Sequence, residues 1–336
     1  MELTATQGPT ERVTTRAVDT PVALEIARSA LGQRFDTVSG LRRLTGGASR
    51  ETWAFDAEGT FGRSVPLILQ VERPGAVNGG GTMALEAAVQ RAARGAGVPV
   101  PEVLATGAKH PLGRPYLLLE RLTGETIPRR VLRAPELSVA RQRFAAEAGE
   151  LLARVHSIAP ADVHGIDAAD PVEQYSGVLH RLPAAYPALE LGLRWLQWHE
   201  PCPGDRVVLH GDFRLGNLLF GETGIRGVLD WELCHVGDPA EDLAWLCLKA
   251  WRFGSGSPIG GLGEREELYR SYERASGRAV DPERVHWWEV FGNIKWAVIC
   301  ALQAQAHREG HVRSVELLSL GRKVSEVELE LLGLLS

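Results

Sequence analysis

The sequence predicts an α+β fold in which a small antiparallel sheet is followed by a larger, mostly helical part. Between residues 35 and 121, short apolar runs alternate with turns that contain glycine or proline, a pattern typical of antiparallel strands. One amphipathic stretch, MALEAAVQRAARGAG, interrupts these runs and predicts a helix inserted among the strands. After Gly124 the apolar residues recur at helical spacing almost to the C-terminus.

The first third of the chain supplies the predicted sheet. Residues 1–18 are polar and rich in threonine, so we expect a flexible N-terminus. A helix is predicted at PVALEIARSALGQRF, followed by two strands and a glycine turn in LRRLTGGASRETWAFDAEG. Further strands are predicted at PLILQVERPG and at YLLLERLTGE, which breaks at Gly124. The first lobe is therefore assigned to residues 19–121.

The remaining residues, 122–336, are assigned to a helical lobe. The predicted helices are RQRFAAEAGELLARVHSI, YPALELGLRWLQWHE, PAEDLAWLCLKAW, REELYRSYERASG, residues 282–309 and VELLSLGRKVSEVELELLGLLS. Strands interrupt them at VVLHGDFRLGNLLF and IRGVLDW, and GETG predicts the turn of a hairpin.

Composition excludes several classes of protein. The 336 residues are 44% hydrophobic and 24% charged, as in ordinary globular proteins, and the net charge of −5 gives no electrostatic footprint for nucleic acid. The four cysteines (Cys202, Cys234, Cys247 and Cys300) form no CxxC pair, which fits a reducing compartment. The N-terminus lacks the apolar core of a signal peptide, and no apolar run approaches the ~20 residues of a membrane helix. We therefore expect a cytoplasmic protein without membrane insertion and without a nucleic-acid partner.

Several polar residues stand between two short apolar strands, 207–209 and 218–220. A charged group close to a core needs a partner, a metal or a chemical role. Asp212 and Asn217 lie on the connecting loop, and Asp230 lies on the strand predicted to return beside it. The hairpin is therefore expected to bring the three side chains to one end of a pair of strands.

These three residue types match the requirements of phosphoryl transfer. The oxygens of Asn217 and Asp230 suit magnesium, a hard cation that takes phosphate oxygens and waters as its other ligands. Asp212 is then available to accept a proton from a hydroxyl nucleophile. Asn217 follows Asp212 by five positions, the spacing of the catalytic loop of kinases.

The segment HGDFRLGNLLF, followed by GVLDWELCHVGDPAEDLAWL, resembles the aminoglycoside phosphotransferase and choline-kinase family. The resemblance covers roughly residues 35–310 and is strongest to the branch related to the kinase-like domains of acyl-CoA dehydrogenase family proteins. It implies a two-lobed protein-kinase-like fold with a nucleotide-binding first lobe and a catalytic and substrate-binding second lobe. The implied activity is transfer of a phosphoryl group from ATP or GTP, with Mg²⁺, to a hydroxyl group of a small molecule.

The resemblance also implies roles for individual residues of the second lobe. Asp212 matches the catalytic aspartate, and Asn217 and Asp230 match the magnesium ligands. Supporting roles fall to the loop histidine, His210, and to acidic residues that brace the loop, Asp238 and Asp242. His156 is expected to be structural, with a hydrogen bond to the backbone of the loop. Glu232 is expected either to contact a second magnesium ion or to form a surface ion pair, and the ion pair is favoured.

For the nucleotide, the resemblance implies a covering turn in LTGGASRETW, a pairing acid in ALEAAVQ and a hinge in LLLERLTGE that contacts adenine through its backbone. The candidate nucleotide-binding residues are Gly46, Gly47, Ser49, Arg50, Gln70, Arg73, Glu86, Glu120 and Leu122.

Gln70 departs from the family pattern, because it stands where a phosphate-binding lysine is expected. A glutamine can neither neutralise a phosphate nor form an ion pair with Glu86. Either Arg73 or Arg50 supplies the charge, or the strand is misaligned, or nucleotide binding is weak. A pseudokinase-like binding module is therefore an alternative to an enzyme.

Other questions stay open in the sequence. Core packing is the favoured role of the late aromatic residues Trp287, Trp288, Phe291 and Trp296, although the resemblance makes late helices an acceptor wall. The acceptor could be a hydroxyacyl thioester, an amino-alcohol, a sugar or an aminoglycoside. A two-metal hydrolase built on Asp212 and Asp230 is a further alternative, against which the lack of more ligands at metal spacing argues. The oligomeric state is not predicted.

Overall fold

The computed structural model describes residues 16–44, 50–73, 82–311 and 314–336. The chain divides into two compact units. The smaller unit comprises Met1–Ala76 and Val103–Arg121, and the larger unit comprises Val77–Glu102 and Leu122–Ser336. A change of unit after residue 121 coincides with the boundary expected between the lobes. Helix α2 (Met83–Gly95) differs from that assignment, because its buried residues Val89 and Ala93 belong to the hydrophobic core of the larger unit.

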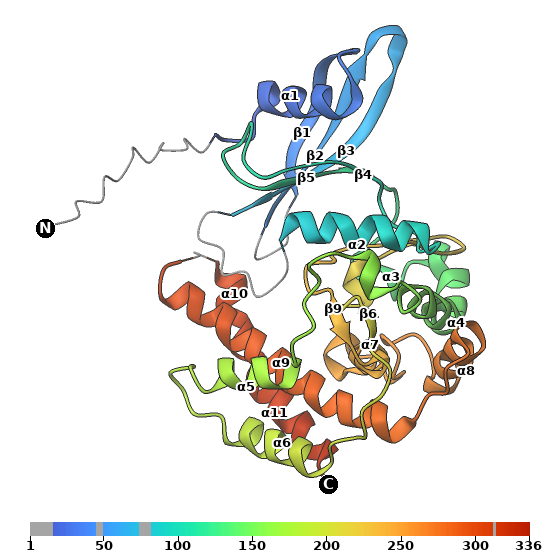
Figure 1. Cartoon of the computed structure of the whole chain (residues 1–336), viewed down its shortest axis with the longest axis vertical. Helices are drawn as coiled ribbons and strands as arrows, with labels where there is room; N and C mark the ends of the chain where they lie inside the picture. The colour runs from blue at the N-terminus through green and yellow to red at the C-terminus, as the bar shows by residue number, and fades with distance from the viewer. Residues whose placement is uncertain (1–15, 45–49, 74–81, 312–313) are drawn as a thin grey trace, which may run out of the picture. The chain divides into compact units, whose positions relative to one another are not determined.

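The smaller unit contains a five-stranded sheet in the order β1-β2-β3-β5-β4, in which every neighbouring pair is antiparallel (Figure 1). The strands are β1 Phe35–Leu44, β2 Arg50–Gly59, β3 Ser64–Glu72, β4 Val103–Gly107 and β5 Tyr116–Glu120. The predicted small antiparallel sheet is thus confirmed.

Helix α1 (Thr20–Leu31) closes the core of the smaller unit. Asp19 caps its N-terminus by accepting a hydrogen bond from the backbone of Val22, and a proline stands in the first turn. Its buried face packs with Phe35 of β1 in one apolar cluster. Residues 1–15 of the segment expected to be flexible lie outside the described residues. Arg16 donates its backbone N–H to the carbonyl of Leu112 at 3.0 Å, so the chain is already held there.

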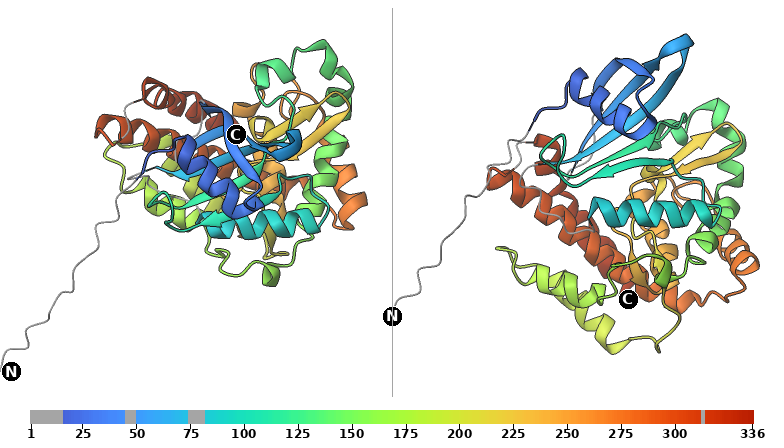
Figure 2. Two further views of the ribbon diagram at one scale, coloured as in Figure 1. Left: turned by 90° about the horizontal axis from the view of Figure 1, so that it is seen from above. Right: turned by 45° about the horizontal axis from the view of Figure 1, so that its top comes forward.

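The larger unit is mostly helical, as predicted (Figures 1 and 2). Besides α2, its helices are α3 Pro128–Val131, α4 Ser138–Val155, α5 Pro171–Leu179, α6 Pro187–Trp198, α7 Pro239–Cys247, α8 Arg265–Ser276, α9 Pro282–Arg308, α10 Val315–Leu320 and α11 Lys323–Leu334. The long helix α9 packs against α5, α6, α7, α10 and α11, and its buried residues form a large part of the core. Helix α5 was not predicted.

Two small sheets carry the polar loop. Strand β6 (Val207–Leu209) pairs with β9 (His235–Gly237), while β7 (Leu218–Gly221) pairs with β8 (Gly224–Val228). The predicted hairpin with the GETG turn is confirmed. The strand β9 was missed, and Asp230 lies two residues beyond β8 rather than within it.

Among the described residues, no helix combines the length and the apolar character needed to cross a bilayer. All four cysteines are free thiols in the structure.

Candidate active site

The loop between β6 and β7 is fixed by a carboxylate from α7. Asp242 accepts hydrogen bonds from the backbone N–H of His210 at 2.8 Å and of Gly211 at 2.9 Å. Gly211 has φ +77°, and a β-carbon there would lie 2.1 Å from the carbonyl oxygen of Leu233. Only glycine fits this turn without a shift of the backbone. The expectation that Asp242 braces the loop is confirmed.

Asp242 is fully buried and remains ionised. Its Oδ2 lies 3.3 Å from Nε2 of His156, whose Nδ1 is 2.9 Å from the hydroxyl of Tyr272. Burial alone would raise the pKa of Asp242, but the hydrogen bonds from the side chain of His156 and the backbone of His210 outweigh it and lower that pKa to about 2. His156 therefore acts on the loop through Asp242, and the expected hydrogen bond from His156 to the loop backbone is wrong.

His210 links the loop to the segment that carries Asp230. Its Nε2 lies 3.0 Å from the carbonyl oxygen of Leu229, and its Nδ1 accepts the backbone N–H of Asp212 at 3.1 Å. Burial lowers the pKa of His210, which favours the neutral ring with Nε2 protonated. This confirms the expected structural role of His210.

The carboxylate of Asp212 is held by three side-chain donors. Oδ1 accepts from Nε of Arg214 at 2.9 Å and from the indole N–H of Trp245 at 2.8 Å, and Oδ2 accepts from Nδ2 of Asn217 at 2.6 Å. The residue is 8% exposed. Hydrogen bonds to a charged group are stronger than those between neutral groups, so the orientation of this carboxylate is strongly fixed.

Asn217 and the segment before Asp230 are tied to each other. The amide Nδ2 of Asn217 also donates to the carbonyl of Asp212 at 3.0 Å, which turns Oδ1 of Asn217 away from that carboxylate. The carbonyl of Asn217 accepts the backbone N–H of Leu229 at 2.8 Å. Asp230 itself has φ +63°, a left-handed conformation that costs a non-glycine residue of order 1 kcal/mol or more and is concentrated at functional sites.

Asp238, the second acidic residue expected to brace the loop, instead caps α7 and pairs with an arginine of α9. Its Oδ1 accepts the backbone N–H of Ala240 and so caps α7, and its Oδ2 pairs with the guanidinium of Arg284 on α9. Asp238 thus positions the bracing helix, and its expected contact with the loop is wrong.

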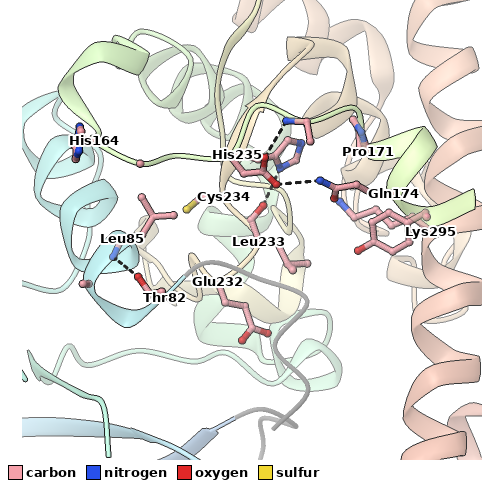
Figure 3. Close-up of a pocket in the computed structure, with 15 residues that line it drawn as sticks. Thr82, Leu85, His164, Pro171, Gln174, Glu232, Leu233, Cys234, His235 and Lys295 are labelled. Atoms are coloured by element: carbon pink, nitrogen blue, oxygen red, sulfur yellow. Dashed lines mark hydrogen bonds between the residues drawn. The ribbon is translucent and has the colours of Figure 1, made fainter. Parts of the chain in front are cut away.

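A pocket of about 500 Å³ lies beside this loop, within the larger unit (Figure 3). Its walls come from the start of α2, the segment before α5, α5 itself, the residues after Asp230 and α9. The lining residues are Thr82, Ala84, Leu85, His164, Gly165, Asp167, Ala169, Pro171, Gln174, Tyr175, Glu232, Leu233, Cys234, His235 and Lys295.

Lys295 and His235, two residues that line this pocket, share one buried carboxylate. Nζ of Lys295 lies 3.0 Å from Oε1 of Glu241, and Oε2 of Glu241 lies 3.0 Å from Nε2 of His235. Burial alone would lower the pKa of both Lys295 and His235. The charge of Glu241 outweighs burial, so the pKa of each residue is raised. Asp167, on the same wall, accepts the side-chain amide of Gln174 at 3.0 Å. Glu232 lines the pocket as well.

Several of these residues were not identified from the sequence. Tyr175 and Gln174 lie on the missed helix α5, although its start carries a usable signal, Asp170 as cap followed by Pro171. Trp245 follows Asp242 by three positions on α7, so both face the loop. The burial of Lys295 could not be predicted from the sequence, because lysine side chains are almost never fully buried.

The predicted nucleotide residues are distributed over both units. Gly46, Gly47 and Ser49 lie outside the described residues. In the smaller unit, Nη1 of Arg50 lies 3.5 Å from Oε1 of Gln70, and Nε of Arg73 donates to the carbonyl of Arg50 at 3.0 Å. Arg50 is only 8% exposed, so the sheet holds a cationic side chain against Gln70.

The other nucleotide candidates lie on three elements. Glu120 ends β5 in the smaller unit, and Leu122 follows in the larger unit. Glu86 lies on α2, where it is 1% exposed and accepts Nε2 of Gln90 at 3.4 Å.

Most of the late aromatic residues lie in the hydrophobic core, which is the role that the sequence analysis favoured for them. Trp287, Trp288 and Phe291 are buried and stack edge to face in series, and the indole N–H of Trp287 donates to the carbonyl of Leu196 at 3.0 Å. Trp296 packs against Trp251, 4.7 Å between ring centroids.

Known proteins share both the sequence pattern and the fold. Residues 40–288 match the model of the phosphotransferase enzyme family. Acyl-CoA dehydrogenase family member 10 of Mus musculus is 33% identical over 182 residues, which cover 51% of this chain and 17% of that protein. Viomycin phosphotransferase of Streptomyces vinaceus is 32% identical over 158 residues, covering 44% of this chain and 53% of that protein. The chain thus spans only a fraction of the acyl-CoA dehydrogenase relative.

Solved structures show the same protein-kinase-like fold. A Ralstonia eutropha protein assigned to the aminoglycoside phosphotransferases matches with a TM-score of 0.72 and 20% identity, covering 94% of this chain and 97% of that one. An aminoglycoside phosphotransferase in ternary complex with AMP-PNP and hygromycin B matches with a TM-score of 0.60 and 18% identity, covering 93% and 97%. Because the family model covers most of the chain, this protein belongs to the phosphotransferase enzyme family.

Proposed function

We propose that this protein is an ATP- and magnesium-dependent O-phosphotransferase whose acceptor is a hydroxyl group of a small molecule. One observation carries the proposal. The carboxylate of Asp212 is held by Arg214, Trp245 and Asn217, and Asn217 is also the residue that spacing and resemblance assign to the metal. The phosphoryl-transfer template requires a base and metal ligands in one site, and the contact between Asp212 and Asn217 places one of each side by side.

Asp212 acts as the base in this proposal. Its carboxylate accepts the proton of the acceptor hydroxyl while the hydroxyl oxygen forms a bond to the γ-phosphorus of ATP. The bond from that phosphorus to the β–γ bridging oxygen breaks, and ADP leaves with the bonding electrons. Catalysis then comes mainly from positioning and electrostatics, which is why the fixed orientation of Asp212 matters.

The chain offers donors that fit magnesium. Oδ1 of Asn217 is turned away from Asp212, and Asp230, held in a strained conformation, supplies a carboxylate. Both are hard oxygen donors, and a set of two leaves room for phosphate oxygens and waters. When bound, Mg²⁺ would offset the negative charge of the phosphates. The relative solved with AMP-PNP supports a nucleoside triphosphate as donor, and GTP is the alternative donor.

We propose that the smaller lobe takes part in nucleotide binding and that Arg50 supplies the positive charge there. A guanidinium beside Gln70 can supply the positive charge that the missing lysine would bring. Glu86, Glu120, Leu122 and the glycine turn at 46–49 remain proposed nucleotide contacts on the strength of the family resemblance.

The pocket beside the loop is proposed to hold the acceptor. Its cationic residues Lys295 and His235 share the buried Glu241, and its carboxylates are Asp167 and Glu232. A substrate with several ammonium groups needs several carboxylates that are not already neutralised. We therefore favour a small acceptor with few or no positive charges, although two relatives are named for antibiotics. The predicted cytoplasmic location stays a prediction.

A second candidate is a nucleotide-binding module without catalysis, which Gln70 favours. It keeps the fold and Asp212 but predicts no transfer to any acceptor. A two-metal hydrolase is not retained, because the chain belongs to a phosphotransferase family.

Calorimetric titration of ATP, with and without Mg²⁺, tests the proposal first. We expect magnesium-dependent binding that Asp230→Ala weakens at least tenfold. The matched control is Asp205→Ala, which removes a carboxylate that is 69% exposed and should leave binding unchanged. A screen of hydroxylated acceptors, read by phosphorus NMR with Asp212→Asn as the inactive control, then tests transfer. Binding without transfer supports the non-catalytic module, and no binding of ATP or GTP contradicts both proposals.

A further inference from the structure

Lys295 is a buried cation that contacts the loop between β6 and β7. It lies on α9, is 2% exposed, and its Nζ donates to the carbonyl oxygen of Gly211 at 3.0 Å. The same ammonium lies 3.0 Å from Oε1 of Glu241 on α7. Gly211 immediately precedes Asp212, so this contact acts on the peptide group that leads into the proposed base.

The ammonium also contacts the aromatic residues around that base. It lies 4.7 Å from the ring centroid of Trp245 and 5.9 Å from that of Tyr175, within the range of cation–π attraction. The indole N–H of Trp245 donates to Asp212. Lys295 lines the pocket (Figure 3), and Tyr175 is another of its lining residues. Lys295 therefore touches the backbone next to Asp212, the side chain that orients Asp212, and the pocket wall.

We propose that Lys295 is a positioning residue for Asp212: its ammonium fixes the Gly211 carbonyl, while Asp242 fixes the two preceding N–H groups. The turn at Gly211 is then held through its donors and through its acceptor. The carboxylate of Asp242 on α7 accepts the N–H groups, and the ammonium of Lys295 on α9 donates to the carbonyl. The kinetic part of this inference rests on the proposed phosphotransferase function, whereas the positioning itself does not.

An ordinary buried ion pair would behave differently. Taking two charges out of water costs about as much as their attraction returns, so neutralising both partners is often neutral or stabilising. The pair Lys295–Glu241 alone could therefore be replaced at little cost. The hydrogen bond to Gly211 could not be lost at little cost, because a neutral, apolar side chain at position 295 leaves the Gly211 carbonyl without its donor.

This difference defines the variants. Lys295→Met removes the donor and leaves the carboxylate of Glu241 with His235 as its remaining cationic neighbour. Lys295→Met combined with Glu241→Gln removes both charges, and glutamine can still hydrogen-bond to His235. Lys295→Arg keeps a cationic donor. Lys249→Met is the matched control, because Lys249 forms an ion pair with Glu330 at the surface.

Hydrogen exchange of the whole protein, read by mass spectrometry, gives a test that needs no substrate. In the double variant we expect a modest fall in melting temperature, because the buried Gly211 carbonyl loses its donor. Exchange in the peptide covering 207–217 should be at least tenfold faster. Peptides from α9 and from the β7–β8 hairpin should exchange as in the wild type. Exchange at 207–217 equal to that of the wild type in the double variant would overturn the proposal.

Kinetics supply the second readout, with Mg·ATP and an acceptor found in the screen above. The double variant should lose at least tenfold in kcat with little change in the KM for ATP, and Lys295→Arg should recover part of the loss. Full activity in the double variant would show that Lys295 only balances Glu241. If the wild type transfers no phosphate, the proposed function fails, and the exchange result still decides the positioning role.

Discussion

The indole N–H of Trp245 donates a 2.8 Å hydrogen bond to Oδ1 of Asp212, and the ring of Trp251 lies 5.4 Å from that of Trp245. Trp251 in turn packs against the guanidinium of Arg214, 4.7 Å from its ring centroid, and Arg214 is the second donor to the same carboxylate oxygen. The two donors to Oδ1 of Asp212 are thus supported by one aromatic cluster, which makes the orientation of the base depend on tryptophan packing.

Trp245→Phe tests this dependence. Phenylalanine keeps most of the packing but removes the N–H donor, and a hydrogen bond to a charged group contributes about 1.5–3 kcal/mol. If that orientation is needed in the transition state, kcat should fall by about tenfold or more, since 1.4 kcal/mol corresponds to a factor of ten. Steady-state kinetics check this, and the affinity for ATP by calorimetry should not change. Trp198→Phe, at a side chain 73% exposed, serves as the control; equal kcat in both variants would contradict the role of Trp245.

Asp242→Asn should make stability less sensitive to acid. The pKa of Asp242 in the folded protein, about 2, lies below its ordinary value of 3.8. A carboxylate with a lowered pKa contributes stability that is fully present above the unfolded value and is lost as pH falls toward the folded value. The fall in pKa from 3.8 to about 2 corresponds to roughly 2 kcal/mol of free energy of unfolding, which is present above about pH 4 and lost between about pH 4 and pH 2.

Urea unfolding as a function of pH measures this effect. The free energy of unfolding of Asp242→Asn should lie at least about 2 kcal/mol below that of the wild type at pH 7, and the gap should narrow below about pH 4. Asp205→Asn, at an exposed carboxylate, should show a gap near zero throughout. A gap for Asp242→Asn that stays constant down to pH 3 would contradict the assigned charge state.

Gly211→Ala should be destabilising and nearly inactive. The residue has φ +77°, and the added β-carbon would meet the carbonyl oxygen of Leu233 at 2.1 Å, a backbone atom that cannot move aside cheaply. We expect a loss of roughly 2–4 kcal/mol in unfolding free energy, because backbone strain and overpacking add. Thermal melting checks it, with Gly256→Ala as the control, since no atom lies within 4 Å of a β-carbon there. Equal melting temperatures of the two variants would argue against the described turn.

Arg50→Met should weaken ATP binding by about tenfold or more if Arg50 supplies the charge that Gln70 lacks, because charge-assisted hydrogen bonds to phosphate contribute about 1.5–3 kcal/mol. Gln70→Lys restores the residue type expected at that position and should partly rescue Arg50→Met. Calorimetric titration of Mg·ATP measures both, with Arg34→Met, an exposed arginine of the same unit, as control. Unchanged affinity in Arg50→Met would exclude Arg50 as the source of the charge.

The sequence by itself determined the class of fold and the family. Strand and helix periodicities are local properties of the chain, so the sheet, most helices and the β7–β8 hairpin could be predicted. The spacing between Asp212 and Asn217 is local too, and the structure brings these two side chains to 2.6 Å of each other. Helix α5 and strands β4 and β9 were missed, because α5 and β4 are short and β9 is defined by its pairing with β6.

The tertiary structure decided which residues surround Asp212. Trp245 and Lys295 lie 33 and 83 positions further along the chain, and nothing local distinguishes an indole in the core from one that donates to a base. Asp238 and Asp242 look equivalent in the sequence, but they differ by about one turn along α7, so the first caps the helix and the second faces the loop. Such roles arise from packing between distant elements, where burial gives a polar group a specific partner.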